Sequence, residues 1–273
     1  MLLQLREKLS YGWVVVFTFF MVRLILMGIR LTFGVFFKSI ESEFNLTRAT
    51  TSAVFSASML LSGAVSILVG WASDRYGPRT VVLLMGLFTG LGLLLTSQTN
   101  AAWQLFITYS LMLSLGAGGV YVVAMSTVPK WFTARRGLAL GITGSGVGLG
   151  TMVFAPLATF LISIFDWRIA FIIMGVAAWF IVIPLSRLLR RAPGESEPLP
   201  DETNPDSNNA ERKRPKNEGA SVQPVGLSII QAFRTRNFWF ILFIWVFQGF
   251  TAFMIITHLV PHATDIGIPA VQA

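Results

Sequence analysis

Long uninterrupted apolar runs constrain this chain more than any other feature of its sequence. A helix needs about 20 apolar residues to cross the roughly 30 Å hydrocarbon core of a bilayer. Seven stretches meet or approach that length: 12–37, 50–72, 80–97, 101–128, 138–165, 169–186 and 237–258. Only helices and closed barrels satisfy their backbone in lipid, and the alternation typical of barrel strands is absent. The sequence therefore predicts an all-α integral membrane protein.

The balance of charged and apolar residues agrees with this prediction. Charged residues make up 12% of the 273 and apolar residues 54%, with a mean hydropathy of +0.67. A soluble domain would carry about 25% charged residues, so this chain could not cover a water-facing surface. The formal net charge of +8 would be compatible with nucleic-acid binding. The basic residues, however, lie mostly between the apolar runs, and we expect no nucleic-acid partner. The chain has no cysteine, and we expect neither a metal site nor a cofactor.

Lysine and arginine are distributed unevenly between the predicted loops. Placing the N-terminus in the cytosol leaves only Lys38, Arg48 and Arg168 outside, with Arg23 and Arg30 inside the first span. Cytoplasmic loops of membrane proteins carry an excess of these residues. The bias predicts a cytoplasmic N-terminus in the plasma or inner membrane. The cytosolic set is Arg6, Lys8, Arg75, Arg79, Lys130, Arg135, Arg136, Arg187, Arg190, Arg191, Arg212, Lys213, Arg214, Lys216, Arg234 and Arg236.

A polar segment, 192–224, divides the chain. It is rich in Pro, Glu, Asp, Asn and Lys, has little to bury, and is predicted to be a disordered cytoplasmic linker. Residues 1–191 are then a six-helix transmembrane bundle, and 225–273 begin a second bundle with an amphipathic segment and the seventh span. Transporters built from two six-helix halves have this plan. On that plan the second half is incomplete, and we expect a truncated product or a fragment of a longer transporter.

One polar motif lies between the second and third predicted spans: Gly70-Trp-Ala-Ser-Asp74-Arg75-Tyr-Gly77-Pro-Arg79. Gly70 allows close helix approach, Gly77 permits a turn conformation that other residues avoid, and Asp74 can meet a cation or a helix N-terminus. The motif resembles the signature loop of the major facilitator superfamily, G-x-x-x-D-R-x-G-x-R. The resemblance implies that Asp74 latches onto a helix of the second half and holds the outward-facing state.

Three other segments resemble the monocarboxylate porter and oxalate/formate antiporter groups of that superfamily. They are Tyr11 to Lys38, Trp131 to Gly141 and Asp166 to Phe171. The resemblance implies a secondary transporter, not an enzyme, that moves a small organic anion by alternating access, with a coupled proton or counter-anion. It also places Arg30 where monocarboxylate porters have a first-span cation that takes part in substrate and proton coupling.

The residues themselves support an anion site in the first span. Arg23 and Arg30 are seven positions apart, which puts them on one helix face, and no carboxylate lies inside the spans. Charge at membrane depth is costly and normally faces a cavity or a partner. We therefore expect an anion from outside this half to neutralise them, with Arg30 as the main substrate residue. The alternative for Arg30 is snorkelling to the outer interface, and a structural role remains open for Arg23.

Two further assignments concern the fourth and fifth spans. Tyr121, in the fourth span, is a candidate for lining the cavity, although a core or interfacial tyrosine is commoner. In the fifth span Gly137, Gly141, Gly144 and Gly148 recur at helical spacing, which predicts close helix packing.

Two other classes of protein remain as alternatives. A seven-span receptor or sensor normally starts outside the cell, whereas this charge bias starts the chain inside. A non-transporting remnant of a transporter would share every feature described so far.

Overall fold

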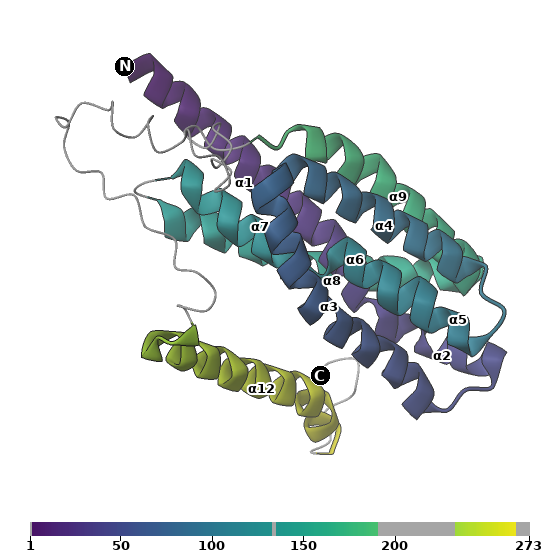
Figure 1. Cartoon of the computed structure of the whole chain (residues 1–273). Coiled ribbons are helices and arrows are strands. Elements are labelled where there is room, and N and C mark those ends of the chain that lie inside the picture. Colours follow the sequence, from purple (N-terminus) through teal and green to yellow (C-terminus); the bar gives the residue numbers. More distant parts are fainter. Residues whose placement is uncertain (1, 133–134, 191–232, 266–273) are drawn as a thin grey trace, which may run out of the picture. The chain divides into compact units, whose positions relative to one another are not determined.

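Every regular element among residues 2–132, 135–190 and 233–265, which the computed structural model describes, is a helix (Figure 1). The chain divides into two units, Met1–Leu199 and Pro200–Ala273. The first unit contains six helical segments that are long and apolar enough to cross a membrane. They lie at the first six predicted spans, and the predicted all-α membrane fold is confirmed.

The helices of the first unit follow the predicted order, with two spans built from several pieces. The first span consists of α1 (Leu2–Leu31) and α2 (Phe33–Phe44). The second, third, fifth and sixth are α3 (Arg48–Tyr76), α4 (Pro78–Ser97), α8 (Arg136–Ile164) and α9 (Trp167–Arg187). The fourth contains α5 (Ala102–Leu105), the π-helix η1 (Phe106–Leu111), α6 (Met112–Ala117), α7 (Val120–Thr127) and the 3₁₀-helix η2 (Val128–Trp131).

The first span is the centre of this bundle. One side of α1 packs along α8, while α4 packs along α9 (Figure 1). Helix α1 buries Phe19, Val22 and Leu26 completely. In α2, Phe33 stacks on Tyr109 of η1 with ring centroids 4.0 Å apart, and Phe36 stacks on Phe171 of α9 at 4.1 Å. These stacks tie the first span to the fourth and the sixth.

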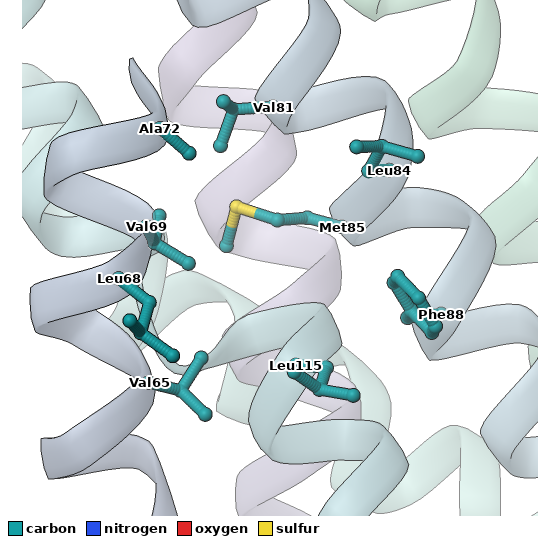
Figure 2. Close-up of a pocket in the computed structure, with 9 residues that line it drawn as sticks. All are labelled: Val65, Leu68, Val69, Ala72, Val81, Leu84, Met85, Phe88 and Leu115. Atoms are coloured by element: carbon teal, nitrogen blue, oxygen red, sulfur yellow. The ribbon is translucent and has the colours of Figure 1, made fainter. Parts of the chain in front are cut away.

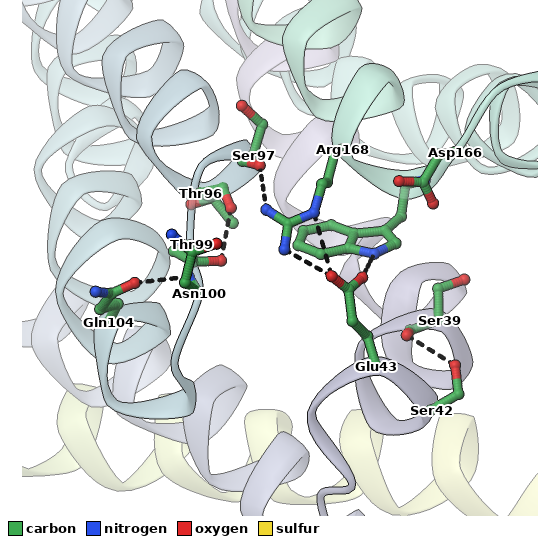
Figure 3. A network of polar contacts seen from close by, with 11 residues as sticks. Ser39, Ser42, Glu43, Thr96, Ser97, Thr99, Asn100, Gln104, Asp166 and Arg168 are labelled. Carbon is green, nitrogen blue, oxygen red and sulfur yellow. Dashed lines mark hydrogen bonds and ion pairs between the residues drawn. The ribbon is translucent and has the colours of Figure 1, made fainter.

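A polar cluster fastens the ends of three spans together (Figure 3). The Asp166 side chain caps α9 by accepting from the Trp167 backbone N–H at 2.7 Å. Arg168 donates from Nη2 to Glu43 Oε1 at 2.6 Å and from Nη1 to the Ser97 carbonyl at 2.7 Å. The Trp167 indole N–H also donates to Glu43. The segment Asp166 to Phe171 therefore joins the ends of α2, α4 and α9.

The second unit contains α12 (Arg236–Asp265), which includes the predicted seventh span 237–258. Crossing of the membrane by α12 remains a prediction. The predicted linker 192–224 lies outside the described residues.

Candidate functional site

Arg30 is buried between the first, second and fourth spans. Its side chain is 4% exposed, so it does not snorkel to the surface of the bundle. Nη2 donates to the backbone carbonyl of Ser58 at 3.0 Å and lies 3.4 Å from the Ser58 hydroxyl and 3.5 Å from the sulfur of Met59. The carbonyl of Arg30 accepts from the Tyr109 hydroxyl at 3.0 Å. Arg30 thus joins α1 to α3 and η1.

The Ser58 carbonyl is the centre of a polar cluster on the inner side of α3. Besides the hydrogen bond from Arg30, it accepts one from the Ser62 hydroxyl at 2.7 Å and one from the Ser114 hydroxyl of α6 at 2.8 Å. One turn away, Ser110 of η1 donates to the Val54 carbonyl at 2.7 Å. All of these acceptors are neutral. The cluster hydrogen-bonds the Arg30 guanidinium without neutralising its charge.

Arg23 has fewer partners than Arg30. Its side chain is 6% exposed, and its guanidinium carbon lies 5.2 Å from the ring centroid of Tyr121 on α7, a cation–π distance. The buried Nε and Nη1 atoms of Arg23 have no hydrogen-bond partner among the described residues, and the same is true of Nε of Arg30. Three guanidinium nitrogens are therefore buried and unpaired in the first span.

These contacts add to the prediction for the two arginines. Helix α3 presents a neutral backbone carbonyl to Arg30, and the anion expected from outside this half stays a prediction. The ion pair between Arg168 and Glu43 lies in the cluster of Figure 3, not at either arginine of the first span. Arg23, rather than Arg30, has the larger number of unpaired buried nitrogens.

The signature motif forms the tight turn between α3 and α4. Gly77 has φ 86° and ψ 160°, a region that is essentially restricted to glycine. Its N–H donates to the Ser73 carbonyl at 2.9 Å, and Pro78 opens α4 at the first helical position, where its missing N–H costs nothing. A Cβ on Gly70 would lie 3.3 Å from Val122 of α7, so the two helices approach closely there. Gly77 therefore forms the turn, and Gly70 lies at a close contact between α3 and α7.

The charged members of the motif lie on the surface. Asp74, Arg75 and Arg79 are all exposed. The guanidinium of Arg75 lies 5.7 Å from the ring of Trp71 and 6.0 Å from that of Tyr76. The latch predicted for Asp74 requires a helix of the second half and stays a prediction.

The predicted packing glycines of the fifth span occupy the open side of α8. A Cβ at Gly137, Gly141, Gly144 or Gly148 would meet no atom of the described residues within 4 Å. Close packing is provided instead by Gly146 and Gly150, where a Cβ would lie 2.6 Å from the Phe20 carbonyl oxygen and 2.2 Å from that of Leu24. The predicted stripe therefore does not contact α1 in the described part of the bundle, and the close packing expected of it stays a prediction.

Comparison with known proteins gives one family match and several similar proteins. The family profile described as Major Facilitator Superfamily matches residues 12–273. The chain is 29% identical to monocarboxylate transporter 14 of Homo sapiens over 193 residues, 71% of the chain and 38% of that protein. It is 26% identical to monocarboxylate transporter 11 of Mus musculus over 259 residues, 95% of the chain and 54% of that protein.

A bacterial protein is also similar to the chain. A probable sulfoacetate transporter of Cupriavidus necator is 31% identical over 140 residues, 51% of the chain and 32% of that protein. The chain matches between 32% and 54% of the length of these three relatives.

Proposed function

The chain belongs to the Major Facilitator Superfamily, and on that premise we propose that it forms part of a secondary transporter for a small organic anion of the monocarboxylate kind. Transport would proceed by alternating access, in which two halves rock about a site near the middle of the membrane. The protein would lie in the plasma or inner membrane with a cytoplasmic N-terminus. A proton or a counter-anion would be coupled to the substrate.

The observation that carries this proposal is the unpaired guanidinium of Arg23. Leaving a buried donor unsatisfied costs about 1–3 kcal/mol, and more for a charged group. Arg23 has two such donors, at Nε and Nη1. The spans predicted from the sequence contain no carboxylate to meet them. A substrate carboxylate would satisfy these donors and offset the charge in one step, and a guanidinium keeps its charge at any working pH.

Arg30 and Tyr121 have supporting roles in this proposal. Arg30 keeps its full charge beside the neutral Ser58 carbonyl, so it adds positive potential to the site and has one further unpaired donor at Nε. The ring of Tyr121 holds the Arg23 guanidinium by a cation–π contact. Arg23 would meet the anion directly, while Arg30 would mainly attract it and fix α1 against α3.

The names of the relatives agree with this substrate class. Monocarboxylate and sulfoacetate transporters are both named for small organic acids. The second half of the fold would complete the site and would receive Asp74 as a latch in the outward-facing state.

The test is uptake of labelled lactate, pyruvate, formate, oxalate and sulfoacetate by cells that express the complete gene product. We expect uptake of at least one acid, and a loss of about tenfold or more in Arg23→Ala, because a charge-assisted hydrogen bond is worth roughly 1.5–3 kcal/mol. Arg187→Ala is the matched control, since Arg187 is an exposed arginine at the end of α9. Unchanged uptake in both Arg23→Ala and Arg30→Ala would remove the proposed anion site.

A further inference from the structure

An apolar pocket lies between the second, third and fourth spans, away from the arginine site (Figure 2). It has a volume of about 150 Å³. Every side chain that lines it is apolar: Val65, Leu68, Val69 and Ala72 of α3, Val81, Leu84, Met85 and Phe88 of α4, and Leu115 of α6. Water gains no hydrogen bonds in such a cavity, so a hydrocarbon is its natural occupant.

The pocket opens onto the apolar surface of the bundle. Leu68 and Leu84, on either side of it, are 63% and 45% exposed. In a protein that spans the bilayer, apolar surface of this kind faces either lipid chains or another helix. An acyl chain can therefore enter the pocket from the side.

One end of the pocket lies next to the signature turn. In Figure 2, Ala72 and Val81 mark one end, and Val65 and Leu115 mark the other. Ala72 precedes Arg75 by three residues, and Val81 follows Arg79 by two. With a helical rise of about 1.5 Å per residue, both arginines lie within roughly one turn of the pocket's end.

The same end carries the residues that mark the level of the lipid headgroups. Trp71 and Tyr76 are both 57% exposed, and amphipathic aromatic rings collect at the membrane–water interface. Arg75 and Arg79 are exposed beside them. The cytoplasmic leaflet is rich in anionic lipids, which basic residues at the ends of transmembrane helices attract. Positive charge at the headgroup level thus lies directly above a hydrocarbon-lined pocket.

We propose that this pocket binds one acyl chain of an anionic phospholipid, whose phosphate contacts Arg79 at the signature turn. The lipid would bridge α3 and α4 next to the turn at Gly77, so its binding would stiffen the turn that carries Asp74. This site is separate from the arginines of the first span, and its test does not depend on transport.

The proposal can be tested by photo-cross-linking on the purified chain in mixed micelles. The probes are phosphatidylglycerol and phosphatidylcholine with the same photoactivatable acyl chain, followed by mapping of the labelled peptides. We expect labelling of the α3 and α4 segments that line the pocket. Phosphatidylglycerol should label about fivefold more than phosphatidylcholine, since one basic residue near the surface is worth about 1 kcal/mol.

Two pairs of variants separate the headgroup from the chain. Arg79→Gln should remove the preference for phosphatidylglycerol, whereas Arg187→Gln, at the end of α9, should keep it. Leu84→Trp fills the pocket and should abolish labelling there, while Leu87→Trp, on the same helix outside the lining, should not. Circular dichroism and monodisperse elution confirm that each variant is folded.

Three results would overturn the proposal. Equal labelling by the two lipids would mean ordinary boundary lipid, and unchanged labelling in Leu84→Trp would place the chain elsewhere. Competition by free inorganic phosphate at the same concentration as the lipid would indicate a phosphate ion site rather than a lipid site.

Discussion

At the scale of single residues, the turn between α3 and α4 depends on Gly77. Its backbone, with φ 86° and ψ 160°, lies in a region that costs other residues about 1–3 kcal/mol. We therefore predict that Gly77→Ala lowers the free energy of unfolding by about that amount, measured as a fall in the thermal midpoint of the purified chain in detergent.

Gly63→Ala is the control for this substitution. Gly63 lies inside α3, and a Cβ there would meet no atom of the described residues within 4 Å, so alanine should be neutral or stabilising by up to about 1 kcal/mol. Equal thermal midpoints for the two variants would show that the turn carries no backbone strain.

The residue scale is also where prediction from the sequence was least complete. The motif around Gly77 could be predicted, because a glycine that must adopt positive φ is conspicuous in a short turn between two helices. The partner of Arg30 could not. It is the backbone carbonyl of Ser58, which every residue type possesses, and it is brought to Arg30 only by the packing of α3 against η1 and α6. A hydrogen bond to a backbone carbonyl cannot be predicted from the identity of the residue that accepts it.

At the scale of helices, the contact between α1 and α8 depends on two glycines that face inward. Glycine spacing alone identifies a helix able to pack closely, but two stripes on one helix satisfy the same spacing rule. Gly146 and Gly150 approach the backbone of α1, whereas the stripe containing Gly144 and Gly148 faces open space in the described part of the bundle. Because lipid is as apolar as leucine, the sequence does not indicate which stripe faces a neighbour.

This difference predicts that substitution by alanine has opposite effects on stability at Gly150 and at Gly148. Gly150→Ala should destabilise the bundle by about 1–3 kcal/mol, because the new Cβ would lie 2.2 Å from the Leu24 carbonyl oxygen and the helices must move apart. Gly148→Ala should raise stability by up to about 1 kcal/mol through helix propensity.

Thermal midpoints and limited proteolysis in detergent would compare the two variants of α8. A lower midpoint for Gly148→Ala than for Gly150→Ala would mean that the open stripe, not the inner one, carries the contact. Loss of transport without loss of stability in Gly148→Ala would instead assign the open stripe to the second half of the fold.

At the scale of the whole molecule, the order of the spans was predictable because lipid leaves the backbone few choices. An apolar run of this length has to be a helix, and six such helices lie at the predicted places. Their arrangement was not predictable, because nearly every helix face is apolar and neighbours are selected by small residues and by single polar groups such as Arg30 and Arg168. Only the distribution of charged residues indicates which ends of the helices lie on the cytoplasmic side of the membrane.

The orientation can be tested directly, because the chain has no cysteine and each introduced thiol is the only one. Helix α4 is 20 residues long, about 30 Å, so its two ends must lie on opposite sides of the membrane. Thr80 at its beginning and Gln98 at its end are both exposed. The charge bias predicts that Gln98→Cys reacts with a membrane-impermeant maleimide in intact cells, and Thr80→Cys only after permeabilisation. The reverse pattern would invert every span and place the signature turn, with Arg75 and Arg79, on the outer surface, away from the leaflet that attracts them.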